Sequence, residues 1–161
     1  MSHWESNGKS NEWYTPQYIF DALAVDFTLD VAAPMDRKFC CVPASDFITK
    51  ESLEMEWNGF VWMNPPFGGR NGIIPWLNKI IKHRNGIALT PDRSSTDWWF
   101  ATSRLADSHL QIHGKVKFIR PDGSTGDQPS HGITLFAFGK TAVEALKNAD
   151  KNNLGAHFKR F

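Results

Sequence analysis

The sequence is poor in cysteine, and the two cysteines that it has stand side by side. Cys40 and Cys41 are the only ones among 161 residues. Adjacent cysteines do not easily bridge each other, and the chain has no CxxC pair of the kind that binds zinc. We therefore expect reduced thiols, a cytoplasmic location and no disulfide framework.

The chain also lacks an excess of charge of either sign and any long apolar run. Its formal net charge of +1 argues against a protein that coats nucleic acid by bulk electrostatics, but it is compatible with a local basic face. No apolar run approaches the roughly 20 residues of a membrane span. Residues 1–11 are polar and unlike a signal peptide. We expect no membrane partner.

Length and composition indicate one globular domain. The chain is 41% hydrophobic and 22% charged, which is typical of folded proteins. We expect a flexible lead-in over residues 1–11 and a single domain over residues 12–161. Seven Trp and twelve Phe are an unusual excess. Such side chains fill cores, line pockets or stack on bases.

Segments with helical and extended patterns alternate along the chain. Apolar residues at helical spacing predict helices over residues 16–24, 75–84, 96–105 and 140–149. Short apolar runs predict strands over residues 27–31, 60–63, 87–90, 110–113, 116–119 and 133–138. We expect a helical turn over residues 50–57 and mainly loop, with a strand turn, over residues 32–46. The alternation predicts an α/β domain with a mostly parallel sheet, closed by an antiparallel hairpin of the last two strands.

Three polar or special residues fall at the ends of predicted strands. They are Asp30, Asn64 and Pro91. In open parallel sheets, ligands bind outside the carboxyl ends of the strands. These three residues on one rim therefore predict a cofactor cleft.

The most informative segment is Asn64, Pro65, Pro66 and Phe67, directly after a predicted buried strand. The Asn64 side-chain oxygen can accept a hydrogen bond from an amino N–H. The Pro65 carbonyl can accept a second one because Pro66 has no N–H, and the two prolines hold both acceptors in place. Phe67 offers a flat face for stacking a base. Asn-Pro-Pro also occurs in plain turns, but the preceding strand and the aromatic fourth residue favour a catalytic loop.

Two acceptors on one amino group make its nitrogen more nucleophilic, because they draw the lone pair away from ring conjugation. Such a nitrogen can attack the sulfonium methyl group of S-adenosylmethionine (SAM). Asn is no base at neutral pH, so the proton would pass to solvent, and positioning would supply the rate. The loop therefore predicts methylation of an exocyclic amino group.

Four segments are informative together: residues 12–16 (EWYTP), 29–33 (LDVAA), 45–47 (SDF) and 62–68 (WMNPPFG). In order and spacing they resemble the phage-encoded DNA N6-adenine methyltransferase (Dam) family. The tail is similar over residues 117–123, Pro129 and residues 132–135. The resemblance covers about residues 11–140. The first segment together with the Asn-Pro-Pro-Phe loop makes it specific.

The resemblance implies a Rossmann-like, SAM-dependent methyltransferase that acts on N6 of adenine in double-stranded DNA, in the host cytoplasm if the chain is phage-encoded. It implies a catalytic loop at Asn64, Pro65, Pro66 and Phe67. The implied cofactor site comprises Trp13, Thr15 and Pro16 at the methionine end, Asp30, Ala32 and Ala33 in the first SAM motif, and Asp46 and Phe47 at the adenine end.

The chain departs from more familiar SAM enzymes after Asp30. Ala32, Ala33 and Pro34 stand there in place of a Gly-rich loop. Small residues still permit a close approach of the backbone to a ligand. The stretch from Asp30 to Asn64 is short and does not clearly indicate a carboxylate for the SAM ribose, for which Asp36 is a candidate.

An adenine must leave the duplex to reach this chemistry, and the chain has no room for a separate recognition domain. Recognition is therefore expected in loops around the cleft. The candidate DNA contacts are Arg70, Arg93, Arg120 and His131. Nothing pairs with His131 at ligand spacing, so we predict no metal site.

Two other interpretations are compatible with the sequence. A catalytically silent methyltransferase-like module could bind DNA or a protein, which the missing Gly-rich loop motivates. An active enzyme could instead methylate N4 of cytosine, RNA or a protein, because the same amino-group chemistry serves all of these.

Overall fold

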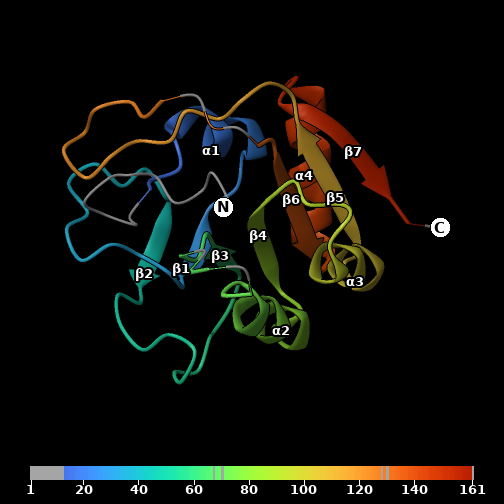
Figure 1. Cartoon of the computed structure of the whole chain (residues 1–161), viewed down its shortest axis with the longest axis horizontal. Helices are drawn as coiled ribbons and strands as arrows, with labels where there is room; N and C mark the ends of the chain where they lie inside the picture. The colour runs from blue at the N-terminus through green and yellow to red at the C-terminus, as the bar shows by residue number, and fades with distance from the viewer. Residues whose placement is uncertain (1–12, 67, 70, 128, 130, 161) are drawn as a thin grey trace.

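Seven strands form one sheet in the part of the chain that the structure describes (Figure 1). This computed structural model describes residues 13–66, 68–69, 71–127, 129 and 131–160. The predicted lead-in over residues 1–11 lies outside them. The strands are β1 (Phe27–Asp30), β2 (Ala44–Phe47), β3 (Val61–Met63), β4 (Gly86–Pro91), β5 (Ser108–Ile112), β6 (Ile133–Phe138) and β7 (Gly155–Lys159). Their order across the sheet is β2-β1-β3-β4-β6-β5-β7.

Most strands of the sheet point the same way. The pairs β1–β2, β1–β3 and β3–β4 are parallel. Strand β6 is antiparallel to both of its neighbours, β4 and β5, and β7 is antiparallel to β5. Strands β1 to β5 therefore share one direction, and only β6 and β7 oppose it. This arrangement confirms the predicted mixed α/β domain with a mostly parallel sheet.

The predicted C-terminal hairpin is wrong in its first arm. Residues 116–119 do not pair with β6, because β4 and β5 occupy its two edges. Instead Ile119 forms isolated bridges with Tyr14 and Thr125. Val116 and Phe118 are buried while Lys117 is exposed, so buried and exposed side chains do alternate here. Alternation reports which side chains are buried, and it does not identify the strand that pairs with the backbone.

Four helices are present among the described residues, close to the predicted ones. They are α1 (Gln17–Leu23), α2 (Ile74–His83), α3 (Asp97–Leu105) and α4 (Lys140–Lys151). Helix α2 has Pro in its first turn, where a missing N–H costs nothing. The Thr96 side chain caps α3 by accepting a hydrogen bond from the Trp99 N–H at 3.3 Å.

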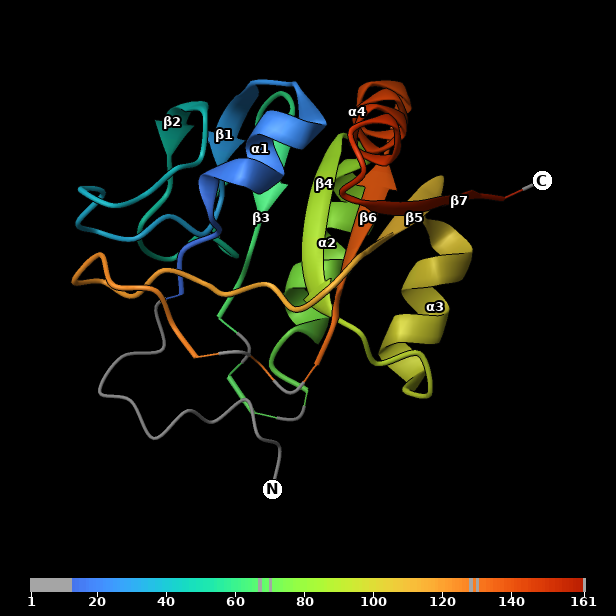
Figure 2. The same ribbon diagram turned by 90° about the horizontal axis from the view of Figure 1, so that it is seen from above.

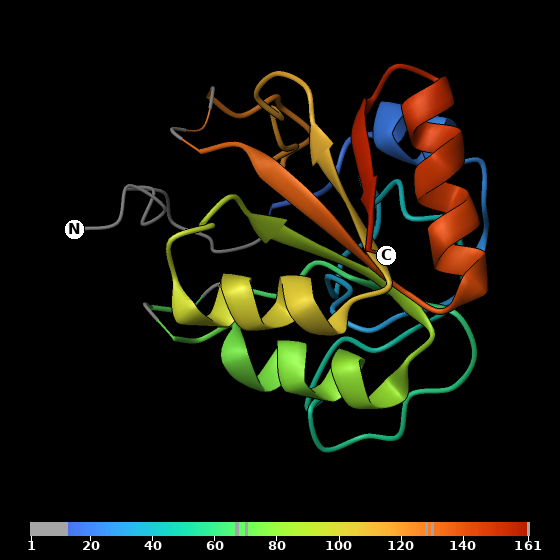
Figure 3. The same ribbon diagram turned by 90° about the vertical axis from the view of Figure 1, so that its right-hand side faces the viewer.

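The helices cover the two faces of the sheet in pairs. Figure 3 shows α2 and α3 on one face and α1 and α4 on the other. Two core clusters match these faces: Trp62 belongs to the cluster with α1 and α4, and Met63 to the cluster with α2 and α3. Successive residues of β3 thus bury their side chains on opposite faces, which explains why the whole strand reads as apolar.

The strand order changes direction beside β1. The chain passes from β1 to β2 on one side, and then crosses to β3 on the other side of β1. In open sheets such a point leaves a crevice at the carboxyl ends of the two central strands. Asp30 is the last residue of β1, and Asn64 directly follows β3. The fold therefore brings these two predicted residues to one crevice.

The long connection from β5 to β6 reaches back toward this rim. In Figure 2 it runs beside α1 toward the loop between β1 and β2. Ile119 exchanges backbone hydrogen bonds with Tyr14, at 2.8 and 2.9 Å. Gly123 packs so closely on the ring of Phe39 that a Cβ there would lie 2.6 Å from it. The connection thus holds the segment before α1 against the crevice.

Candidate active site at the switch point of the sheet

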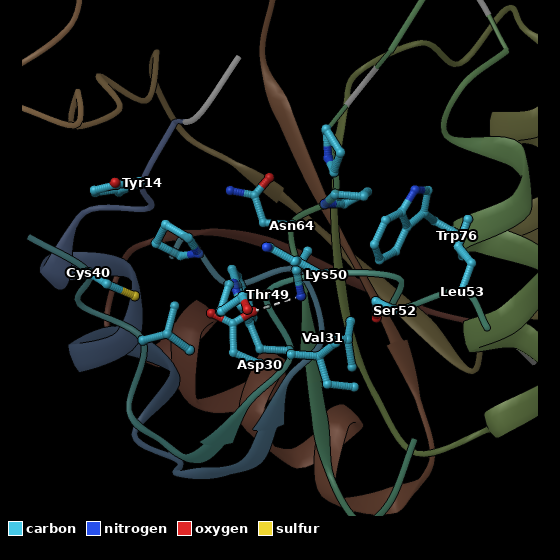
Figure 4. A pocket seen from close by; sticks show the side chains of 18 of the residues that line it. Tyr14, Asp30, Val31, Cys40, Thr49, Lys50, Ser52, Leu53, Asn64 and Trp76 are labelled. Atoms are coloured by element: carbon cyan, nitrogen blue, oxygen red, sulfur yellow. Dashed lines mark hydrogen bonds between the residues drawn. The ribbon is translucent and has the colours of Figure 1, made fainter. Parts of the chain in front are cut away.

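A cavity of about 480 Å³ opens at the carboxyl ends of β1 and β3 (Figure 4). This volume is typical of sites that hold a small organic molecule. Residues from separate parts of the chain line it: residues 13–15, 30–34, 48–54 and 64–66, with Cys40, Val42, Trp62 and Trp76. The cavity therefore depends on the fold as a whole.

Asp30 is a buried carboxylate on the floor of this cavity. It is only 3% exposed, and one of its oxygens accepts a hydrogen bond from the Ala32 N–H at 3.1 Å. Burial raises the pKa of the Asp30 carboxyl to about 7, although the Ala32 N–H and the charge of Arg37 act to lower it. No described cation forms an ion pair with Asp30. A cationic group of a ligand beside Asp30 would further favour its ionised form.

Asn64 is held in one orientation by the segment before α1. Its side-chain nitrogen donates to the Trp13 carbonyl and to the Thr15 hydroxyl, both at 3.2 Å. A carbonyl can only accept, so the amide nitrogen must face Trp13 and the amide oxygen must face away from it. Thr15 is 2% exposed, and its hydroxyl makes no cap on α1. The Asn64 oxygen is therefore left on the side of the amide that faces away from Trp13.

The two prolines follow Asn64 along the cavity wall. Pro65 is buried and Pro66 is exposed, and both line the cavity. Phe67, the fourth predicted residue of the loop, lies outside the described residues. The Asn64 side chain, the two prolines and the Asp30 carboxylate thus meet at one site.

Comparison with known families decides the class of protein. A family model described as DNA N-6-adenine-methyltransferase (Dam) matches residues 3–153. The chain belongs to this family. Membership confirms the resemblance seen in the sequence, and it indicates a methyltransferase whose class acts on adenine in DNA. No curated protein and no solved structure gives a significant match.

The structure brings some residues of the expected Dam cofactor site together and leaves others outside. Residues that line the cavity are Trp13, Thr15, Asp30, Ala32 and Ala33. Pro16 is buried directly before α1 but is not part of the lining.

Asp46 and Phe47, on β2, also lie outside the cavity lining. Asp46 is exposed and accepts a hydrogen bond from the Phe47 N–H at 2.8 Å. The Arg37 guanidinium lies 3.7 Å from the centre of the Phe47 ring. Asp36 caps its own turn by accepting from the Lys38 N–H, and it too is outside the lining. The roles that the resemblance implies for Asp46 and Phe47 stay predictions.

The sequence did not identify the wall formed by residues 48–54. It follows β2, so it lies at the end of a third strand on the same rim. It brings two exposed acidic residues, Glu51 and Glu54, to the lining of the cavity. Glu51 adopts a left-handed backbone conformation, with φ of 52°, which is rare outside glycine and common at functional sites. The position directly after a strand end was the only available signal.

Of the candidate DNA contacts, Arg93 and His131 lie together. An Arg93 nitrogen and the His131 Nε2 are 3.0 Å apart. On the rim, Arg93 follows β4 and His131 precedes β6. Arg120 is held within its own loop by the Thr125 carbonyl at 2.8 Å and by Asp127 at 3.4 Å. None of these three residues lines the cavity. Arg70 lies outside the described residues.

Two other features are absent from the part of the chain that the structure describes. The described residues contain no cluster of three or more His, Cys, Asp or Glu side chains that could hold a metal ion. Within the same part of the chain, no helix has the length and apolar character needed to cross a membrane.

Proposed function

We propose that this protein transfers a methyl group from SAM to N6 of adenine in double-stranded DNA, on a Rossmann-like fold. Family membership supports the class of reaction. The observation that carries the proposal is the meeting of Asn64, with its amide orientation fixed, and Asp30, buried without a cation, in one cavity. The strand order around β1 supports the fold assignment.

The cavity fits SAM in size and in charge. Its 480 Å³ lies within the range of sites for ligands of this kind. The Asp30 carboxylate suits the ammonium of the methionine end, and Ala32 and Ala33 allow close approach where a Gly-rich loop is missing. Glu51 and Glu54 are the carboxylates that we assign to the ribose hydroxyls. The adenine end is assigned to residues 48–54, which Asp46 and Phe47 directly precede.

When bound, SAM supplies an activated methyl group, and the chain positions the acceptor. The Asn64 oxygen and the Pro65 carbonyl accept the two protons of the adenine amino group and so direct its lone pair toward the methyl carbon. The N–C bond forms as the S–C bond breaks, and the amino proton passes to solvent. The oriented acceptors stabilise the positive charge that develops on nitrogen. Phe67 is proposed to stack on the flipped base.

DNA approaches from the other side of the Asn64 loop in this proposal. The adenine must be flipped out of the duplex, which costs a few kcal/mol of stacking and pairing. Arg93 and His131 lie on the rim beyond β4, where they can contact phosphates of the flipped strand. Arg70 and Arg120 are proposed as further contacts.

Transfer of a labelled methyl group from SAM to unmethylated duplex DNA tests the proposal. Asn64→Ala is expected to lower kcat by about 10²–10³-fold, the usual effect of removing one group that stabilises a developing charge, while SAM still binds. Asn78→Ala is the matched control, because Asn78 is exposed on α2, away from the cavity lining. If calorimetry detects no SAM binding at millimolar concentration, the protein is instead a silent methyltransferase-like module.

A further inference from the structure

Lys79 of α2 places its ammonium among backbone carbonyls of the cavity wall. Its Nζ donates to the Ser52 carbonyl at 3.0 Å, to the Leu53 carbonyl at 2.8 Å, and to the Met55 carbonyl. The same nitrogen lies 4.9 Å from the centre of the Trp57 ring. An ammonium has three N–H donors and here has three acceptors. The side chain is thus fully engaged, unlike most lysines on a helix surface.

These carbonyls belong to the turn that forms one wall of the cavity. Ser52 and Leu53 line the cavity themselves, and so do their neighbours Glu51 and Glu54 (Figure 4 shows Ser52 and Leu53). Within the turn, the Glu54 N–H donates to the Glu51 carbonyl at 3.0 Å. The Trp57 indole N–H reaches both the Ser52 carbonyl and the Ser52 hydroxyl at 3.0 Å. Lys79 and Trp57 therefore hold this wall.

The helix that carries Lys79 is also the helix that follows the catalytic loop. Helix α2 begins at Ile74, shortly after Asn64, and presents Trp76 to the cavity. Trp76 and Lys79 are three residues apart, so they share one side of the helix. In Figure 4 Trp76 lies beside Leu53. One helix thus lines the cavity with its first turn and fixes the opposing carbonyls with Lys79.

The type of residue matters at this position. An ammonium is a compact charge whose three donors can diverge to three carbonyls, whereas a guanidinium is a planar fork. Burial lowers the pKa of the Lys79 ammonium. Its charge also compensates the dipoles of the three carbonyls that converge on it.

We propose that Lys79 is a positioning residue that fixes residues 51–54 as the wall of the cofactor cavity and so sets the affinity for SAM. The inference rests on the proposed function, because it takes this cavity to be the SAM site. Lys79 touches neither the Asn64 side chain nor the reacting atoms in this account. Its removal should therefore weaken SAM binding and leave the rate at saturating SAM nearly unchanged.

Lys79→Met, which keeps the aliphatic stem, tests this inference with the full-length protein. Calorimetry is expected to show a roughly tenfold rise in the Kd for SAM, the scale of one charge-assisted hydrogen bond. The KM for SAM should rise in parallel, while kcat at saturating SAM and the KM for DNA stay within about twofold of wild type. Lys82→Met is the matched control, because Lys82 is exposed on the same helix, and it should leave all four quantities unchanged.

Two outcomes would overturn the inference while the proposed function stands. The first is wild-type SAM affinity in Lys79→Met, and the second is a loss of kcat that SAM cannot restore. If Lys79→Met does not fold, Trp57→Phe replaces it, because it keeps an aromatic ring at this buried position and removes the indole N–H that holds Ser52. It should also raise the Kd for SAM and spare kcat. If the wild-type protein itself binds no SAM, the proposed function fails, and the inference fails with it.

Discussion

The two sides of the Asn64 loop differ in how they are built. On one side, which we call the cofactor side, residues from β1, from the wall after β2 and from the segment before α1 converge on one cavity. On the other, which we call the DNA side, Arg93 and His131 form a pair outside that cavity, and Arg120 is bonded within its own loop. The cofactor side is a single cavity lined by several segments, whereas the residues of the DNA side lie on loops outside that cavity.

This difference suggests where the protein is specific. A cavity with a buried carboxylate can select one small molecule by shape and charge. Cations on loops contact phosphates, which give affinity without information about sequence. In the proposed function, the described residues therefore explain the choice of cofactor in more detail than the choice of DNA site. Substitutions on the cofactor side should change SAM binding, and substitutions on the DNA side should change DNA binding.

The largest effect after that of Asn64 is expected for Asp30 on the cofactor side. Asp30→Asn should raise the Kd for SAM about 100-fold, because the ammonium of the ligand would lose its buried charged partner. Above pH 7, where Asp30 is ionised, the same change should stabilise the protein without ligand, since it removes a buried charge that has no ion-pair partner among the described residues. Calorimetry and thermal melts measure both effects.

The matched substitution for Asp30→Asn is Asp46→Asn, on an exposed carboxylate outside the cavity. It should change the Kd for SAM by less than about threefold, in line with the small worth of exposed charges. Equal losses in the two variants would contradict the assignment of the adenine end to residues 48–54. They would favour Asp46 as a direct contact.

The pH dependence of SAM binding should follow the same carboxylate. The pKa of Asp30 is raised to about 7 by burial, and a cationic ligand binds the ionised form. Affinity should therefore fall by up to about tenfold per pH unit below pH 7 and level off above it. The Asp30→Asn substitution should remove this pH dependence of the affinity for SAM. A slope that persists in Asp30→Asn would assign the titration to another group.

The stability of the protein without ligand should change with pH in the opposite sense. Between the usual Asp pKa of 3.8 and the raised value near 7, the folded protein holds a proton that the unfolded chain has released. The stabilisation from Asp30 is therefore fully present below the lower value and is lost as pH rises through the higher one. Thermal melts of wild type and Asp30→Asn across this range measure the difference.

On the DNA side, Arg93→Ala should raise the KM for DNA by about tenfold and reduce the salt dependence of binding by about one phosphate contact. The Kd for SAM should stay unchanged. Arg120→Ala is expected to have a smaller effect, because its guanidinium is already bonded to Thr125 and Asp127. Anisotropy of a labelled duplex at two salt concentrations compares them. A larger effect at Arg120 would reverse the proposed order of contacts.

The smallest effect is expected where the two sides meet. Thr15→Val removes one of the two acceptors that orient the Asn64 amide, and the Trp13 carbonyl remains. We expect a roughly fivefold lower single-turnover rate at saturating SAM, the scale of one hydrogen bond. An unchanged rate would show that Trp13 alone suffices to orient Asn64.

The sequence predicted the buried elements better than the exposed ones. Strand β3 is fully buried and α2 has a clear apolar face, so both patterns were readable. Strands β2 and β7 have no fully buried residue, and periodicity gave no sign of β7 and at most a strand turn near β2. The predicted pairing of β6 with residues 116–119 was wrong because β5 also precedes β6 and has a similar strand-like pattern.

At the site, the sequence predicted residues that a local pattern indicates, and it missed residues that only the folded chain brings to the cavity. Asn64 and Asp30 stand at strand ends, and that position alone indicated their rim. The wall at residues 48–54 is held by hydrogen bonds from Lys79 to residues that lie 24 to 27 positions earlier in the chain. No local pattern encodes such a contact. Only the packing of α2 against the turn reveals it.

The central claim is that the Asn64 loop presents adenine, in DNA, to SAM. Mass spectrometry of nucleosides from unmethylated duplex DNA, after incubation with the protein and SAM, tests it most directly. We predict N6-methyladenine as the modified nucleoside in wild type and its loss in Asn64→Ala. N4-methylcytosine as the product, or unmodified DNA from a protein that binds SAM, would contradict the claim.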